Sequence, residues 1–240
     1  VNIESSDFDG SRQFTADLDG GDDDDSINIS GYSDSRTGRT DITVSGGEGN
    51  DTIDVTDRFA GSASNSNGNR YGFATVELDA GSGRDEIELS GVLQGSITTG
   101  TGSDTVVLTA QQYRTLKEGD RSMATSESSW NGTVYETVAA EAIRVTDFTA
   151  GSGGDVLDID DLLKNGASNY DGANPFSSGH LTLEQEGANT LVRFDADGSG
   201  SGDSIVMLVL EGVTASTLTV DNFTPNFAPP STNAAPVAPE

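Results

Sequence analysis

Aspartate recurs at a fixed place in a short glycine-rich pattern, and this arrangement is the one best suited to binding chemistry. The clearest copy is GGEGNDTID at 46–54. The others are AGSGRDEIE at 80–88, TGTGSDTVV at 99–107, AGSGGDVLD at 150–158 and the degenerate GGDDDDSIN at 20–28. Glycine allows a tight turn that brings main-chain carbonyl oxygens together, and the aspartate adds a carboxylate. Because Ca2+ prefers about six to eight such oxygen ligands, the pattern predicts calcium-binding turns.

The candidate metal ligands are the glycines and the aspartate of each copy, together with acidic residues of the degenerate copies. A sixth, weaker copy ends at Gly202-Asp203-Ser204-Ile205. One isolated copy of this composition is as often an ordinary loop turn as a metal site. The fixed offset between the aspartate and the next aliphatic residue, repeated in every copy, favours metal sites. The selected residues are Asp23, Asp25, Gly47, Gly49, Asp51, Gly81, Gly83, Asp85, Gly100, Gly102, Asp104, Gly151, Gly153, Asp155 and Asp203. At one ion per copy, we expect several Ca2+ ions, about four to six.

Other catalytic and metal-binding patterns are scarce in the sequence. The absence of cysteine and the single histidine, His180, exclude thiolate zinc sites, disulfides, cysteine nucleophiles and multi-histidine metal centres. No motif surrounds His180, so we expect a structural role for it. The segment 195–200, DADGSG, superficially suggests an EF-hand loop, but glycine stands at the fourth place and Val206 at the twelfth. We therefore favour a hairpin turn over a metal site built from Asp195 and Asp197.

The charge of the chain is strongly negative. It carries 40 Asp and Glu residues against 12 Lys and Arg, which gives a formal net charge of -28. A charge of this size repels nucleic acid and anionic membranes and favours cations as partners. No apolar run approaches the ~18 residues of a membrane span, and no cationic–apolar N-terminal signal is visible. Without cations, we expect self-repulsion and low apolar content to leave the chain largely unfolded.

Strands must position these turns, because aliphatic residues flank each copy at strand-like spacing. Each unit is therefore predicted to be strand–turn–strand. Asp85 and Asp104 are 19 residues apart, close to one coil of two nine-residue units. The longer intervals predict loops or extra strands inserted on one side of a coil, and the stretches at 60–71 and 117–132 have the composition of such loops. The predicted inward-pointing residues after the turns are Ile27, Ile53, Ile87, Val106, Leu157 and Ile205.

Helical pattern is limited to short stretches at 110–117 and 160–164, and strands return between 181 and 223. Residues 225–240 hold five of the six prolines and predict an extended, unstructured tail. The sequence therefore predicts an all-β fold. We expect a parallel β-roll or β-helix with dispersed calcium-binding turns and inserted loops, ending in a strand-rich C-terminal cap.

The pattern GGxGxDxUx, in which U is a bulky apolar residue, resembles the RTX nonapeptide repeat of calcium-dependent parallel β-rolls. The copy at 46–54 matches every defined position, and those at 80–88, 99–107 and 150–158 lack only the first glycine. The resemblance implies that an ion sits between two turns and ties neighbouring coils together.

A second resemblance covers 143–223, which is similar to the C-terminal targeting region of type I secretion substrates of Gram-negative bacteria. The strings that carry it are IRVTDFTAGSGGDVLDIDDLL, LVRFDADGSGSGDSIVMLVLEGV and STLTVDNF. The resemblance implies export by the type I secretion machinery and a secreted or cell-surface location, with folding after export where calcium is plentiful. We expect an RTX-like β-roll region at 1–142, a strand-rich targeting-like region at 143–224 and a Pro/Ala-rich flexible tail at 225–240.

Three functions compete at this point. The leading hypothesis is a calcium-binding structural protein, not an enzyme, that folds after secretion and self-associates into a surface layer, fibre or adhesin. The motif-bearing region spans nearly the whole chain, which leaves little room for a separate catalytic domain. The alternative is the C-terminal secretion and folding module of a larger RTX exoenzyme or toxin. A third hypothesis, halophilic acidity on an ordinary enzyme, ranks last because many acidic residues stand at a fixed offset in turns.

Overall fold

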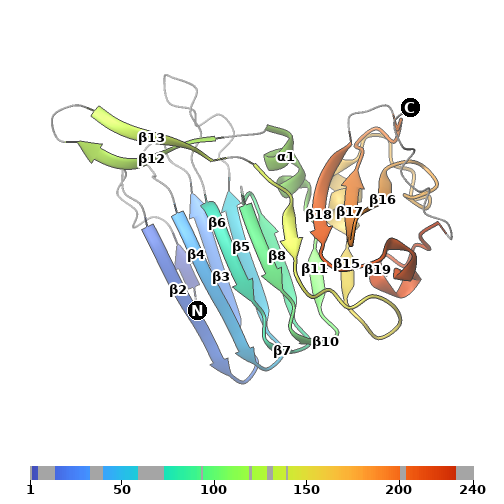
Figure 1. Cartoon of the computed structure of the whole chain (residues 1–240), viewed down its shortest axis with the longest axis horizontal. Helices are drawn as coiled ribbons and strands as arrows, with labels where there is room; N and C mark the ends of the chain where they lie inside the picture. Colours follow the sequence, from blue (N-terminus) through green and yellow to red (C-terminus); the bar gives the residue numbers. More distant parts are fainter. Residues whose placement is uncertain are drawn as a thin grey trace.

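The structure is a computed structural model that describes residues 2–4, 14–32, 40–58, 73–92, 94–118, 121–128, 132–138, 140–200 and 204–230. Strands dominate these residues, and most belong to two large sheets that run along the molecule (Figure 1). Sheet I has seven strands in the order β1-β3-β5-β8-β11-β15-β19. Sheet II has ten, in the order β10-β7-β4-β6-β9-β14-β18-β17-β16, with β2 also paired to β4.

The bounds of the elements follow the turn copies closely. The strands of sheet I are β1 (Asn2–Glu4), β3 (Ser26–Tyr32), β5 (Thr52–Arg58), β8 (Glu86–Ser90), β11 (Thr105–Val107), β15 (Val156–Asp158) and β19 (Phe223–Thr224). Those of sheet II are β2 (Phe14–Asp22), β4 (Thr40–Glu48), β6 (Phe73–Asp79), β7 (Ser82–Gly83), β9 (Gln94–Thr98), β10 (Thr101–Gly102), β14 (Ile143–Val145), β16 (Leu181–Glu186), β17 (Asn189–Phe194) and β18 (Ile205–Leu210). The remaining elements are α1 (Ala110–Glu118), β12 (Arg121–Ser128), β13 (Gly132–Val138), η2 (Leu162–Gly166), η3 (Ala215–Thr217) and η4 (Val220–Asn222).

The chain alternates between the two sheets, with the short strands β7 and β10 following β6 and β9 within sheet II, so each coil contributes to both sheets. From β2 to β11 the chain passes back and forth in this way, and neighbouring coils pair in parallel throughout. Pairing at matched positions requires the two sheets to advance together along the molecule. The predicted all-β parallel roll is confirmed.

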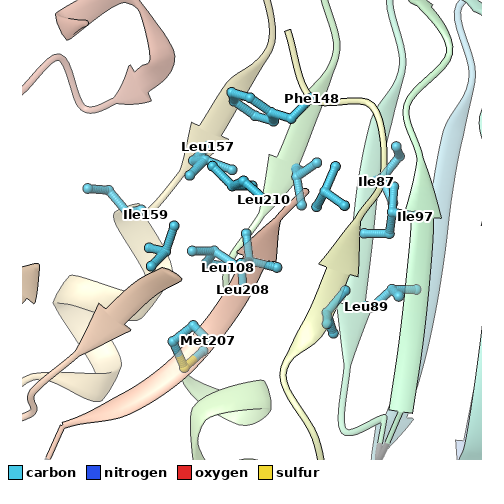
Figure 2. Close-up of a cluster of buried hydrophobic side chains, with 14 of the residues drawn as sticks. Ile87, Leu89, Ile97, Leu108, Phe148, Leu157, Ile159, Met207, Leu208 and Leu210 are labelled. Atoms are coloured by element: carbon cyan, nitrogen blue, oxygen red, sulfur yellow. The ribbon is translucent and has the colours of Figure 1, made fainter. Parts of the chain in front are cut away.

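The core lies between the sheets and is built from alternate positions of their strands, as a period of two requires. Ile27, Ile53 and Ile87 on sheet I are at most 1% exposed, and the facing residues of sheet II include Leu78 and Ile97. Figure 2 shows how Ile87 and Ile97 approach each other from the two sheets. The predicted inward residues after the turns at 20–25, 46–51, 80–85, 99–104 and 150–155 are all buried.

Insertions lie at the edge of the roll opposite the glycine-rich turns, as Figure 1 shows for α1 and the β12–β13 ribbon. The predicted helix at 110–117 is present as α1. The predicted loop at 117–132 is wrong in part, because β12 pairs in antiparallel with β13. A loop search based on glycine and serine overlooks such a ribbon, whose partner lies beyond the loop's predicted end. The predicted loop at 60–71 lies outside the described residues.

Both sheets continue past residue 142, since β14 pairs with β9 and β15 pairs with β11. Antiparallel strands β16, β17 and β18 then extend sheet II. The hairpin turn predicted at 195–200 is confirmed, because it connects β17 to β18. Ile205 therefore follows a hairpin connection and not a turn of the roll, and Asp203 of the weak sixth copy lies outside the described residues.

The start of the Pro/Ala-rich segment is not the free tail that composition predicts. Phe227 packs against the core, and Asn174 donates from Nδ2 to the carbonyl oxygen of Ala228 at 2.8 Å. These contacts anchor residues 225–230, because an aromatic side chain among the prolines supplies apolar area. Residues 231–240 lie outside the described part of the chain.

The outward face of sheet I carries neighbouring acidic side chains. Asp54 on β5 lies opposite Glu88 on β8, and Glu88 is half-buried. Burial, with added repulsion from Asp54, Asp161 and Glu86, raises the pKa of Glu88 to about 7. The ionised form of Glu88 therefore destabilises the fold.

Glu88→Gln is expected to stabilise the protein at alkaline pH. Because the folded-state pKa is raised from the ordinary 4.5 to about 7, the wild type loses stability as pH rises through this window. The gain from the variant should be absent below pH 4.5, grow between pH 4.5 and 7, and then stay constant. Urea unfolding across this pH range in excess calcium measures it. An equal gain from Glu86→Gln, the exposed charge-matched control on β8, would contradict the specific burial of Glu88.

Candidate cation-binding turns

Five glycine-rich turns gather at one edge of the roll, and we call them the turn stack: 20–25, 46–51, 80–85, 99–104 and 150–155. The first four are in register, as the pairing of β2 with β4, of β4 with β7 and of β7 with β10 shows. In Figure 1 they lie at the lower ends of the strands. We call two consecutive turns a step, which gives four steps.

Glycine is required for two reasons in the stacked turns. Gly47, Gly81 and Gly100 have φ angles of 106°, 97° and 87°, in the left-handed region that disfavours side chains. A Cβ at Gly81 would also overlap the carbonyl oxygen of Gly47 in the preceding turn. Further along the turns, a Cβ at Gly83 would overlap the carbonyl oxygen of Gly49. The predicted glycines thus permit the close approach of successive turns.

Each aspartate of the pattern accepts a hydrogen bond from the aspartate of the turn before it. The main-chain N–H of Asp25 donates to Oδ1 of Asp51 at 2.8 Å, and that of Asp51 donates to Oδ1 of Asp85 at 2.8 Å. The N–H of Asp85 donates to Asp104 at 2.9 Å, and that of Asp104 donates to Asp155 at 3.0 Å. From Asp51 onward these residues are at most 2% exposed. Five of the predicted aspartates, from Asp25 to Asp155, therefore form one ladder, which is buried from Asp51 onward.

Three of the buried carboxylates have one oxygen without a partner. Oδ2 of Asp51, Asp85 and Asp104 has no hydrogen-bond partner within the described part of the chain. Burial raises the pKa of Asp104 to about 6; the N–H of Asp85 opposes this rise, and the carboxylates of Asp155 and Asp85 add to it. Burial also raises the pKa of Asp85. The ladder is thus short of positive charge, because a buried carboxylate is costly unless it is compensated.

The oxygens around these atoms fit a cation bound by carboxylate and main chain together. A Cβ placed on Gly46 would contact both the carbonyl oxygen of Ala80 and Oδ2 of Asp51, so these two oxygens converge. Among the described residues, no three His, Cys, Asp or Glu side chains form a group that could hold a metal ion. The stack instead offers three free carboxylate oxygens, on Asp51, Asp85 and Asp104, and that of Asp51 lies beside the main-chain carbonyl of Ala80. This donor set suits Ca2+, which accepts carbonyl and carboxylate oxygens and binds readily in flexible geometry.

The first described turn, 20–25, differs from the next two by an aspartate in place of a glycine. Asp23 stands where the next turns have Gly49 and Gly83, and it adopts a φ of 75°. No turn precedes Asp23 within the described ranges, so no neighbouring carbonyl meets its side chain there. Asp25 is half-buried and its N–H starts the ladder.

The last turn departs from the pattern that its sequence suggests. Gly151 and Gly153 have φ angles of 97° and 80°, but a Cβ on either would meet nothing within 4 Å. The N–H of Gly151 instead donates to Oδ1 of Asn222 at 2.8 Å, and Nδ2 of Asn222 donates back to the Gly151 carbonyl at 3.1 Å. Sequence inspection missed Asn222 because it stands in no glycine-rich copy.

The residues weighed outside the turn copies lie away from the stack. His180 is 5% exposed, and its Nδ1 lies 2.8 Å from the hydroxyl of Ser178. The carboxylate of Asp195 accepts the N–H of Asp197 at 3.1 Å and that of Gly200 at 2.9 Å. These bonds close the hairpin turn.

Two parallel sheets joined at one edge by stacked glycine–aspartate turns define a parallel β-roll with candidate cation sites between its turns. No protein-family model matches the chain, and no curated protein matches it. Among solved structures, the chain is similar to the AlgE6R3 subunit of the Azotobacter vinelandii mannuronan C5-epimerase, with 22% identity, a TM-score of 0.28 and coverage of 92% of this chain and 86% of that chain. It is also similar to the AlgE6R2 subunit of that enzyme, with 22% identity, a TM-score of 0.31 and coverage of 91% and 94%. At these values, the fold assignment rests on the strand pairings described above.

Gly81→Ala is expected to destabilise the protein more than Gly151→Ala. Both glycines have a φ of 97°, so alanine meets the same backbone strain, but only at Gly81 would its Cβ overlap a carbonyl oxygen. We expect an additional loss of about 1–3 kcal/mol at Gly81, the range typical of overpacking. Urea unfolding of both variants in excess calcium measures the difference. Equal losses would contradict the close stacking of the turns.

Proposed function

We propose that this chain is a calcium-binding β-roll module of the RTX type, which belongs to a larger secreted protein and folds when Ca2+ fills the steps of its turn stack. The observation that carries the proposal is the set of buried, partnerless carboxylate oxygens on Asp51, Asp85 and Asp104. A bound cation would supply the missing partner at each of them. Its binding free energy then becomes folding free energy, because the site does not exist in the unfolded chain.

The charge of the chain supports calcium-coupled folding. A formal charge of -28 repels the compact state, and each divalent ion removes two charges from that sum. Cytosolic calcium is low and extracellular calcium is high, so folding would follow export. We infer an extracellular location and, from the targeting-like region at 143–223, export by the type I machinery of a Gram-negative bacterium. No helix in the described ranges is long and apolar enough to cross a membrane.

A module within a larger protein has more support than a self-assembling lattice protein. Asp23 occupies the position where the next two turns have Gly49 and Gly83. If another turn stacked before it, the Cβ of Asp23 would collide with that turn, as a Cβ at either glycine would with the turn before it. Beyond the last turn, Asn222 occupies the hydrogen-bonding groups of Gly151. The one large apolar side chain exposed on the described surface is Val220. Self-association through stacked turns or apolar patches therefore has little support. We assign calcium binding and folding to this chain, and no catalytic step.

Calcium is expected to convert an expanded chain into a compact monomer. A chain of 240 residues has a radius of gyration of about 54 Å when unfolded and about 18 Å when compact. We expect a fall towards the compact value as calcium rises from excess chelator to millimolar, with a gain of β-structure by circular dichroism. Light scattering measures both size and association. Growth into large particles would favour the surface-assembly hypothesis, and a size independent of calcium would refute calcium-coupled folding.

Asp85→Asn is expected to remove one calcium site with little change in shape. The amide oxygen keeps the acceptor for the N–H of Asp51, but the amide group replaces the partnerless carboxylate oxygen with an uncharged donor. We expect the calcium midpoint for folding to rise at least about tenfold, because one site loses its charged ligand. Asp79→Asn, an exposed residue of β6, removes the same charge outside the turns and is the control. Equal midpoints for the two variants would contradict the assignment of Asp85 as a ligand.

A further inference from the structure

The last step of the turn stack, between turns 99–104 and 150–155, is built differently from the earlier steps. Oδ1 of Asp155 accepts the N–H of Asp104 at 3.0 Å, as in the rest of the ladder. Oδ2 of Asp155, however, accepts the main-chain N–H of Thr149 at 2.8 Å and lies 3.2 Å from the hydroxyl of Thr99. Because Asp155 is 1% exposed, the protein itself satisfies a carboxylate that water does not reach.

Asp147 completes this arrangement from the loop that leads into the last turn. Its carboxylate accepts the N–H of Thr99 at 2.8 Å and that of Gly100 at 2.9 Å. In the preceding step, the N–H of Ala80 donates to the main-chain carbonyl of Thr98 at 2.9 Å. A side chain therefore stands in for the main chain of a stacked turn. Its Oδ1 also lies 3.0 Å from the Thr99 hydroxyl, whose single proton is shared between Asp147 and Asp155. Thr99 is completely buried, whereas Asp147 is exposed, so its bonds to Thr99 are partly buried and its bond to Gly100 lies at the surface.

The contrast between the steps lies in the donors that reach the second oxygen of each aspartate. At Asp51, Asp85 and Asp104 that oxygen has none within the described residues. At Asp155 it has an N–H and a hydroxyl. A cation could therefore bind the free oxygen of Asp51, Asp85 or Asp104. Asp155 has no unsatisfied carboxylate oxygen to offer.

We propose that hydrogen bonds from Thr99 and Thr149 take the place of a cation in the last step, so that this step is locked without calcium. The proposal rests on the proposed function, since it assigns one ion to each partnerless carboxylate oxygen, on Asp51, Asp85 and Asp104. The stack then binds three Ca2+ ions, and Gly151, Gly153 and Asp155 are not ligands. The motif copy at 150–158 keeps the sequence of a calcium turn but has another role.

A locked last step gives the roll an end from which the other steps can close. Turn 99–104 is held through Asp104 and Thr99 before any ion binds. The carboxylate of Asp104 is thereby fixed in position to receive the first ion. The cation-dependent steps then follow towards Asp25, because each ordered turn forms one wall of the next step.

Residue-resolved amide hydrogen exchange of the full chain, in excess chelator and in millimolar calcium, tests the proposal. In chelator we expect the amides of Thr99, Gly100 and Thr149 to remain protected, while those of Asp25 and Asp51 exchange freely. In calcium, all of them should be protected. Loss of protection at Thr99, Gly100 and Thr149 in chelator would overturn the locked step. Equal protection of Asp25 and Asp51 in both conditions would instead refute the proposed calcium function.

The number of bound ions gives an independent measurement. Native mass spectrometry and calorimetric titration with Ca2+ alone should give three ions per chain, one for each partnerless carboxylate oxygen. A fourth ion whose binding protects Thr149 from exchange would overturn the proposal.

Thr99→Ala gives the last step the small residue that the previous turn has at Ala80. In chelator we expect about a tenfold loss of protection at Gly100 and Thr149, since one buried hydrogen-bond donor is removed. Thr99→Ser keeps the hydroxyl and should retain the wild-type protection, which separates loss of the donor from loss of packing. Thr101→Ala, an exposed position of the same turn, is the matched control. Equal effects of Thr99→Ala and Thr101→Ala would overturn the role of the Thr99 hydroxyl.

Discussion

The structure depends on one electrostatic constraint, which is that each buried aspartate of the turn stack needs partners for both of its carboxylate oxygens. The main chain supplies the first partner through the N–H of the preceding aspartate, for example from Asp51 to Asp85. The second must be a positive charge or another donor, because an uncompensated buried carboxylate is strongly destabilising. Where the protein supplies no donor, the proposed function ties its stability to the concentration of a cation. The negative charge of the chain is therefore functional where it is buried in turns.

Glycine and strand register follow from this constraint. An aspartate N–H reaches the next carboxylate only if successive turns approach closely, and side chains at Gly81 or Gly83 would prevent that approach. Register at the turns in turn fixes register along both sheets, because each coil pairs only with its neighbours. The opposite edge carries no such requirement, and it accommodates intervals as different as 19 residues between Asp85 and Asp104 and 51 between Asp104 and Asp155.

The sequence is sufficient to predict the features that repeat. Aspartate two residues before an aliphatic residue, as in Asp51 and Ile53, locates both the turn and the first inward side chain of the next strand. It does not predict Asp147, Thr99 or Asn222, because their partners lie between 47 and 71 residues away and no repeat marks them. For the same reason, the sequence of the copy at 150–158 looks like that of a calcium-binding turn. Its motif matches, but the donors to the carboxylate of Asp155 all lie outside this copy. Composition also predicted a loop where the β12–β13 ribbon begins. The two strands of this ribbon form a sheet of their own.

If the proposed cation sites are filled, the turns that they share make them depend on one another. Turn 46–51 forms one wall of the first step and one wall of the second, and turn 80–85 is shared in the same way. An ion that orders a shared turn lowers the entropic cost of ordering the next site. The next ion therefore binds more tightly, although the two ions do not touch. Repulsion between ions of like charge opposes this coupling, but each step also contains a buried carboxylate that reduces it. The ordering term acts between adjacent steps only, so folding is expected to advance along the stack and not to nucleate at every turn at once.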